Sequence, residues 1–510
     1  MRQLNRRPLA AVAGLLILVA LLTACATPAA EVPTAQPTEV EAEQEEEPAD
    51  EHAEEMVGDL VRGGKLYDTW WAVLASEEET AGEAEHTEEE AHDLSAEAPT
   101  ADHPLWATQS TNTRSGAETW RCKECHGWDY RGAEGAYGSG SHLTGFPGVS
   151  SSTGMPVEEL VAVLAGGTNP DHDFSEVLDE QSLVDLAVFL SEGLIDTDAF
   201  VNADKSSQGN ASAGEVKYGE VCALCHGPQG VAINFGGIEE PEYVVTVAVD
   251  NPWEFLHKVR FGQPGWPMPS ALANQWSEAD VANVLAYAQT LPQDAALDQG
   301  GKLYDAWWEV LDLEPPEGDQ PLWASQTTNT RSGVDTWRCK ECHGWDYQGA
   351  EGAYGSGSHF TGFRGVLGAA ELTAEEVAAW LDGSANPDHD FSAMGESAMS
   401  ELVEFLREET YELSSYVNAD MSVVGDPAAG KPMWDGTCSA CHGIDGRRMN
   451  FGHAEEPEYV GTIARDNPWE FMHKAAFGQP GVPMPSGLAL GWSLSDIADL
   501  LAFAQTLPAQ

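Results

Sequence analysis

The segment Trp120-Arg-Cys-Lys-Glu-Cys-His-Gly-Trp-Asp-Tyr130 decides the fold of this chain, and it recurs without change at 337–347. Its core, C-x-x-C-H, occurs twice more, at 222–226 and 438–442. Eight of the nine cysteines in the 510 residues therefore stand in pairs, and a histidine directly follows each pair. One C-x-x-C-H arises by chance in some sequences, whereas four that use all but one cysteine indicate a shared chemistry.

The C-x-x-C-H motif is typical of covalent haem attachment. Two thiols one helical turn apart bind the edge of the haem as thioethers, and the adjacent histidine reaches the iron from its proximal side. A zinc knuckle or a dithiol redox pair would explain one copy, but not four. We therefore predict four covalently bound haem c groups. The predicted thioether residues are Cys122, Cys125, Cys222, Cys225, Cys339, Cys342, Cys438 and Cys441, and the predicted proximal ligands are His126, His226, His343 and His442.

The composition narrows the class of partner. The chain has 24 Lys and Arg against 84 Asp and Glu, a formal net charge of −60. Nucleic acid is excluded as a partner, because phosphates need a cationic surface. The acidity indicates either a solvated, soluble surface or docking to redox proteins with basic surfaces, and composition does not choose between them.

The ninth cysteine lies at the end of a short apolar run near the N-terminus. Three arginines precede this run, which ends in Leu-Thr-Ala-Cys25. The layout predicts an export signal over 1–24, because the run is shorter than a membrane-spanning helix. It also resembles the bacterial lipoprotein signal, which implies that Cys25 is lipidated. Residues 25–56 are rich in Pro, Ala and Glu and predict a disordered tether. We therefore expect an extracytoplasmic protein, periplasmic or on the cell surface, anchored to a membrane as a lipoprotein.

The rest of the chain is a tandem duplication. Segments 132–142 and 169–175 recur at 349–359 and 386–392. Each half divides again into an A unit and a B unit, with one haem motif in each. The expected domains are A1 at 57–202, B1 at 203–293, A2 at 294–418 and B2 at 419–510. A1 carries an insert of 20 residues before its haem motif, and we interpret the histidines in or beside it, His86, His92 and His103, as surface residues.

Helical periodicity dominates these four units. Both B units end in apolar residues at helical spacing behind a capping box, which runs from Ser277 to Asp280 in B1 and from Ser493 to Asp496 in B2. Little in the chain alternates as a strand does. We predict an all-α fold of four helical domains, each built around a haem.

A short helix, C-x-x-C-H, a methionine in a Pro-rich loop and a closing helix resemble class I cytochrome c, and the B units match this whole pattern. In that family the sixth iron ligand is usually a methionine before the last helix, which implies Met268 and Met484. Each stands 42 residues after its haem histidine in a Pro-Met-Pro-Ser loop. His257 and His473 also repeat, and we interpret them as core or surface residues.

The A units match the haem motif and the closing helix, but they share no methionine between copies. Two histidine pairs are shared instead. His172 and His389 each stand six residues after a glycine, as the methionines of the B units do, and 46 residues after the haem histidine. We predict that they are the axial ligands of bis-histidine haems. His142 and His359, or an open iron, are the alternatives. Arg114 and Arg331, in a repeated Thr-Asn-Thr-Arg-Ser-Gly segment, are either propionate partners or ordinary surface residues.

Two classes of function follow. The first is a tetrahaem electron carrier, which passes single electrons between redox partners in a respiratory or other membrane-linked chain. The second is a haem oxidoreductase that acts on a small sulfur compound at an A-unit haem, since an A–B pair distantly resembles diheme thiosulfate dehydrogenases. Those enzymes use a cysteine thiolate as the distal ligand, and no cysteine is spare here. We therefore favour the carrier.

Overall fold

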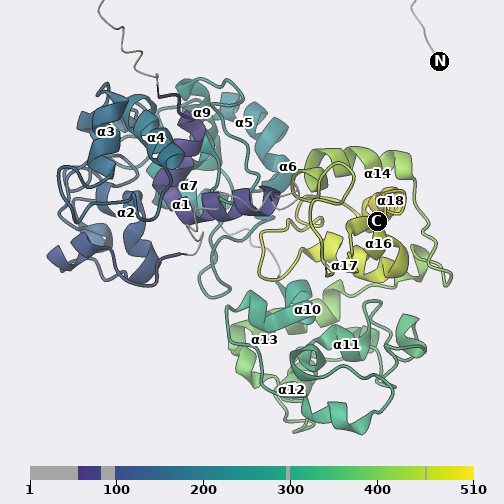
Figure 1. Cartoon of the computed structure of the whole chain (residues 1–510). Helices are drawn as coiled ribbons and strands as arrows, with labels where there is room; N and C mark the ends of the chain where they lie inside the picture. The colour runs from purple at the N-terminus through teal and green to yellow at the C-terminus, as the bar shows by residue number, and fades with distance from the viewer. Residues whose placement is uncertain (1–55, 82–97, 294–298, 454–455, 510) are drawn as a thin grey trace, which may run out of the picture. The chain divides into compact units, whose positions relative to one another are not determined.

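The computed structural model describes residues 56–81, 98–293, 299–453 and 456–509. The all-α prediction is confirmed: these residues form helices joined by loops, and their β-structure is limited to isolated bridges (Figure 1). None of the helices in this part of the chain is long and apolar enough to span a bilayer. The predicted signal, Cys25, His86 and His92 lie outside the described residues, as does most of the tether.

The two A units contain matching helices. Those of A1 are α1 (Leu60–Ala81), α2 (Cys122–His126), α3 (Val157–Leu164) and α4 (Glu180–Val188); those of A2 are α10 (Gly300–Val310), α11 (Cys339–His343), α12 (Ala374–Leu381) and α13 (Glu396–Glu404). The first helix of each unit is broken at the same place, because Thr69 and Ala306 both have extended backbone angles. The duplication therefore extends to an irregular feature of the backbone.

The two B units also match each other helix by helix. Those of B1 are α5 (Ala211–Lys217), α6 (Ala223–His226), α7 (Val244–Asp250), α8 (Pro252–Phe261) and α9 (Glu278–Ala288); those of B2 are α14 (Pro427–Met433), α15 (Ser439–His442), α16 (Val460–Asp466), α17 (Pro468–Phe477) and α18 (Leu494–Ala504). One π-helical turn joins the first helix of each unit to its haem motif, η7 (Tyr218–Cys222) and η15 (Trp434–Cys438). Both predicted capping boxes are present at the start of the closing helix.

The first and last helices of each B unit pack against each other, α5 on α9 and α14 on α18 (Figure 1). Gly214 and Gly430 lie at these crossings. A β-carbon at Gly214 would stand 1.9 Å from the carbonyl oxygen of Asn283, and one at Gly430 would stand 2.0 Å from that of Asp499. Only glycine allows the two backbones to approach this closely.

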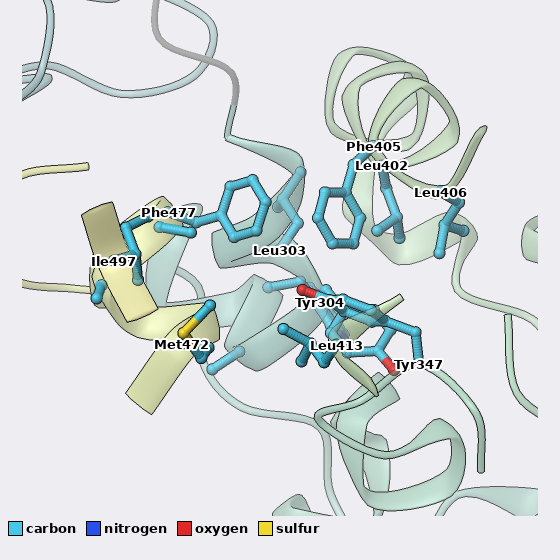
Figure 2. Close-up of a cluster of buried hydrophobic side chains, with 14 of the residues drawn as sticks. Leu303, Tyr304, Tyr347, Leu402, Phe405, Leu406, Leu413, Met472, Phe477 and Ile497 are labelled. Carbon is cyan, nitrogen blue, oxygen red and sulfur yellow. The ribbon is translucent and has the colours of Figure 1, made fainter. Parts of the chain in front are cut away.

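Each A unit shares its apolar core with the B unit that follows it. In the second half one cluster joins Leu303, Tyr304 and Phe405 of A2 to Met472 and Phe477 of B2 (Figure 2). In the first half Phe261, the last residue of α8 in B1, is fully buried in the core of A1. A2 and B2 therefore fold around a common interior, whereas B1 has a cluster of its own and contributes Phe261 to the core of A1.

A buried histidine of each B unit fastens this junction. The His257 ring lies 2.9 Å from the hydroxyl of Tyr130 at Nδ1 and 2.8 Å from the carbonyl oxygen of Gly64 at Nε2. His473 makes the equivalent contacts with Tyr347 and Gly301. Of the two roles considered for these histidines, the core role is therefore the one the structure supports, since both are at most 1% exposed.

Candidate functional site

All four haem motifs have the same local geometry. Each ends a short helix at its histidine, and the glycine that follows has a positive φ of 76° to 80°, which lets the chain turn away from the helix end. The eight cysteines of the motifs are free and partly buried, so none is used in a disulfide. Every thiol pair is thus available beside its histidine.

In the A units the structure brings the proximal histidine and the predicted distal histidine together. The ring centroids of His126 and His172 are 6.3 Å apart, and those of His343 and His389 are also 6.3 Å apart. A metal ion held at about 2 Å from one nitrogen of each ring leaves the two centroids about 6 Å apart. Both clefts therefore have the spacing that two imidazoles on one iron require.

Hydrogen bonds to the backbone orient three of these four rings. Nδ1 of His126 lies 2.7 Å from the carbonyl oxygen of Pro147, and Nδ1 of His343 lies 2.6 Å from that of Arg364. On the distal side, Nδ1 of His389 lies 2.8 Å from the carbonyl oxygen of Trp380. A backbone carbonyl that accepts from Nδ1 leaves Nε2 unprotonated and directed at the metal.

Burial keeps the proximal histidines neutral. It lowers the pKa of His126, His226, His343 and His442 to about 4, and burial is the largest cause for each of them. Neutral imidazole is the form that binds a metal ion, so these rings need not lose a proton to do so at pH 7.

The prediction that His103 is a surface residue is wrong. His103 is 5% exposed rather than on the surface, and its ring lies 6.2 Å from that of His172, centroid to centroid. Burial lowers the pKa of His103 to about 4. Its counterpart in A2 is Gln320, which donates to the carbonyl of Asp388. The sequence does relate His103 to Gln320, because Pro-Leu-Trp-Ala directly follows each of them.

The alternative histidines, His142 and His359, lie in a different setting. The His142 ring stacks on Tyr137 at 4.6 Å, and its Nδ1 is 3.2 Å from Nη1 of Arg114. His359 is placed in the same way against Tyr354 and Arg331. Each arginine also forms an ion pair with the buried glutamate of its haem motif, at 3.2 Å in A1 and 2.6 Å in A2. These histidines thus belong to a polar network beside the motif.

In the B units the predicted methionines lie in a loop that the backbone fixes. Gly262 and Gly478, which end α8 and α17, have φ near 90°, and a β-carbon at either would stand 2.5 Å from the carbonyl oxygen of the methionine, Met268 or Met484. The serine after each Pro-Met-Pro donates to a carbonyl of the preceding helix at 2.6 or 2.7 Å. Met268 packs against the apolar core of B1.

The polar groups of the A units fit a haem. In both copies the same buried atoms lack a hydrogen-bond partner among the described residues: the side-chain nitrogen of Asn112 and Asn329 and the hydroxyl of Tyr137 and Tyr354. An unpaired buried polar group costs about 1–3 kcal/mol. In A2 Tyr354 lines a cavity of about 340 Å³ together with Arg331, Lys340 and His359, and the lining also includes Glu458, Asp466 and Glu470. Such donors suit the carboxylates of haem propionates.

Comparison with known proteins agrees with this reading. Residues 209–287, most of B1, match the family described as "Cytochrome C oxidase, cbb3-type, subunit III". No curated protein matches the chain. Among solved structures it is similar to the "as isolated" form of thiosulfate dehydrogenase (TsdBA) from Marichromatium purpuratum, at 15% identity over 79% of this chain and 89% of that one. The TM-score is 0.18.

The helical fold, the haem motifs and the family match of residues 209–287 together support a c-type cytochrome. Covalently bound haem c is therefore its cofactor, and electron transfer or redox chemistry is its function.

Proposed function

We propose that the protein is an exported, lipid-anchored tetrahaem c-type cytochrome that carries single electrons between redox partners in a respiratory or other membrane-linked chain. The observation that carries this proposal is the 6.3 Å spacing of the histidine rings in both A clefts. A second imidazole at that spacing closes the coordination of the iron, and a closed iron exchanges electrons without binding a substrate.

The axial residues are part of the same proposal. His172 and His389 complete the sites of A1 and A2, and Met268 and Met484 complete those of B1 and B2. When bound, each haem supplies a one-electron couple. The chain's own residues hold it through the thioether cysteines, and in the A units they also orient the axial rings through backbone carbonyls and supply donors to its carboxylates.

The partners and the location are part of this proposal. A formal net charge of −60 suits a redox partner with a basic surface, because complementary charge speeds the encounter of two proteins. The apolar run before Cys25 supports export and a lipid anchor. A membrane-linked donor or acceptor would then be within reach of the chain.

A spectroelectrochemical titration of the purified holoprotein, repeated with carbon monoxide or sulfite, tests the carrier. We expect four haems per chain by pyridine haemochrome assay and two pairs of midpoint potentials that neither ligand shifts. An A-unit haem that binds either ligand would contradict closed coordination. Oxidation of a small sulfur compound would then be the first activity to assay.

A further inference from the structure

The haem motifs of B1 and B2 contact each other. The hydroxyl of Thr437, one residue before Cys438, donates to the carbonyl oxygen of Leu224 at 2.9 Å. Leu224 lies between the two cysteines of the B1 motif. Gly436 faces the same leucine, since a β-carbon there would stand 4.0 Å from Leu224 Cδ2. Helix α6 and the turn η15 are therefore neighbours.

A second contact joins the methionine loop of B2 to the haem motif of B1. The amide of Ser486, two residues after Met484, donates to the carbonyl oxygen of Ala232 at 3.2 Å. Ala489 packs against the apolar core of B1. Its carbonyl oxygen would stand 2.7 Å from a β-carbon at Gly227, the residue directly after His226. This approach requires glycine at 227.

The thioether residues of the two motifs lie on this contact. Leu224 lies between Cys222 and Cys225, and Thr437, which donates to its carbonyl, directly precedes Cys438. The edges at which B1 and B2 attach their haems thus face each other. Each B unit is also joined to its own A unit by a shared core, through Phe261 in the first half and Phe477 in the second.

We propose that B1 and B2 form one redox-coupled pair across this contact, with A1 and A2 at the two outer ends. The order A1–B1–B2–A2 follows from these contacts, whereas the coupling rests on the proposed function, because its test assumes the axial residues given above. Ferric iron carries one more positive charge than ferrous iron. Reduction of one B site therefore makes reduction of the other less favourable, most strongly where little water separates them.

A double-mutant cycle on the intact holoprotein measures this coupling. Met268→His lowers the midpoint potential of B1, so that B2 is reduced while B1 is still ferric; Met484→His does the reverse. In at least one of these variants we expect the unsubstituted partner site to gain about fivefold in its reduction equilibrium, or about 40 mV for one electron. Adding Leu224→Glu and Thr437→Glu, which place like charges across the contact, should abolish that gain.

Val216→Glu is the matched control, because Val216 is 59% exposed on α5 and takes no part in the contact. It should leave the gain in place. The proposal is overturned if the midpoint potential of the substituted site falls but that of its partner site is unchanged in both variants. It is also overturned if the partner's rise in potential persists after both glutamates are added.

A second measurement keeps the contact testable if the axial assignments fail. Failure of those assignments would appear as a Met268→His site whose own midpoint does not fall. Small-angle X-ray scattering then decides: a larger radius of gyration in the Leu224→Glu, Thr437→Glu variant than in Val216→Glu supports the contact, and equal radii overturn it.

Discussion

The A and B clefts differ in how they hold the proximal histidine. In A1 and A2 its Nδ1 contacts a backbone carbonyl, of Pro147 or Arg364. In B1 and B2 the Nδ1 atoms of His226 and His442 are buried and have no partner among the described residues. A hydrogen bond at Nδ1 makes the imidazole a stronger donor to the metal and favours the ferric state. We therefore expect the contact behind the proximal ring to lower the A-unit potentials, in the same direction as the proposed second axial imidazole.

In this comparison the midpoint potential of a haem depends on two separate parts of the sequence, the axial residue and the loop behind the proximal histidine. The proposed axial residues stand 42 or 46 positions after the haem histidine. The proximal hydrogen bond comes from a separate loop, which isolated bridges pin at Gly132 with Pro147 and at Gly349 with Arg364. We therefore expect a low potential in an A unit to need both the distal histidine and the proximal hydrogen bond. The first variant below, His172→Met, changes the distal histidine and keeps the proximal hydrogen bond.

His172→Met should give the largest effect, because it replaces the distal imidazole of A1 by the ligand type proposed for B. A thioether stabilises ferrous iron. We expect the A1 midpoint to rise by at least about 60 mV, which is tenfold for a one-electron couple, yet to remain below those of B1 and B2 because the Pro147 contact is retained. Spectroelectrochemistry measures both. His142→Met is the control and should leave the A1 midpoint in place; the reverse result would mean that His142 is the ligand.

Gly214→Ala tests the helix crossing that distinguishes the B units. The added methyl would stand 1.9 Å from the Asn283 carbonyl oxygen, so α5 and α9 must separate. Overpacking of this kind costs about 1–3 kcal/mol, and urea unfolding followed by haem absorbance should show it. Gly219→Ala is the matched control, since no atom lies within 4 Å of its β-carbon position. Equal midpoints for the two variants would refute a close crossing.

The junction histidines predict acid sensitivity of each A–B pair. Burial lowers the pKa of His257 to about 3 and that of His473 to about 4. A depressed histidine pKa means that the unfolded chain binds more protons below about pH 6.5, so stability falls as pH falls from there. Between pH 6.5 and 5 each histidine should remove about 2 kcal/mol. Denaturant unfolding of His257→Gln should have a shallower pH slope than wild type, and an unchanged slope would count against this assignment.

Ser277→Ala should give the smallest effect. Its hydroxyl caps α9 by accepting from the amide of Asp280, at 3.2 Å. Loss of a serine cap costs about 1 kcal/mol, and Ser493→Ala in B2 should cost the same. Thermal unfolding of the two variants checks this equivalence; clearly unequal losses would show that the two B units are not energetically alike.

The repeated local features of the fold could be predicted from the sequence, but the contacts between units could not. The helical class followed from periodicity, and glycine six residues before His172 and His389 marked the end of a helix: α3 ends at Leu164 and α12 at Leu381, just before Gly166 and Gly383. Both glycines have positive φ. Local patterns of this kind are readable because a helix end depends on residues close in sequence.

The contacts between units could not be predicted from the sequence. Nothing near Phe261 marks it as part of the A1 core, and nothing near Leu224 marks its contact with Thr437, 213 residues away. His103 was misplaced because an acidic insert precedes it, although its ring is buried beside His172. Such burial depends on which segments meet in space, and spacing along the chain does not encode it.

The shared core bears on how such a chain can lengthen. A1 depends on Phe261, and A2 on Phe477, for part of its interior, so an A unit without its B unit would leave an apolar gap where that ring belongs. An A unit can thus be copied with its interior intact only together with its B unit. The gene was therefore free to double by pairs of haems, and insertion or loss of a single haem would have had to rebuild a core.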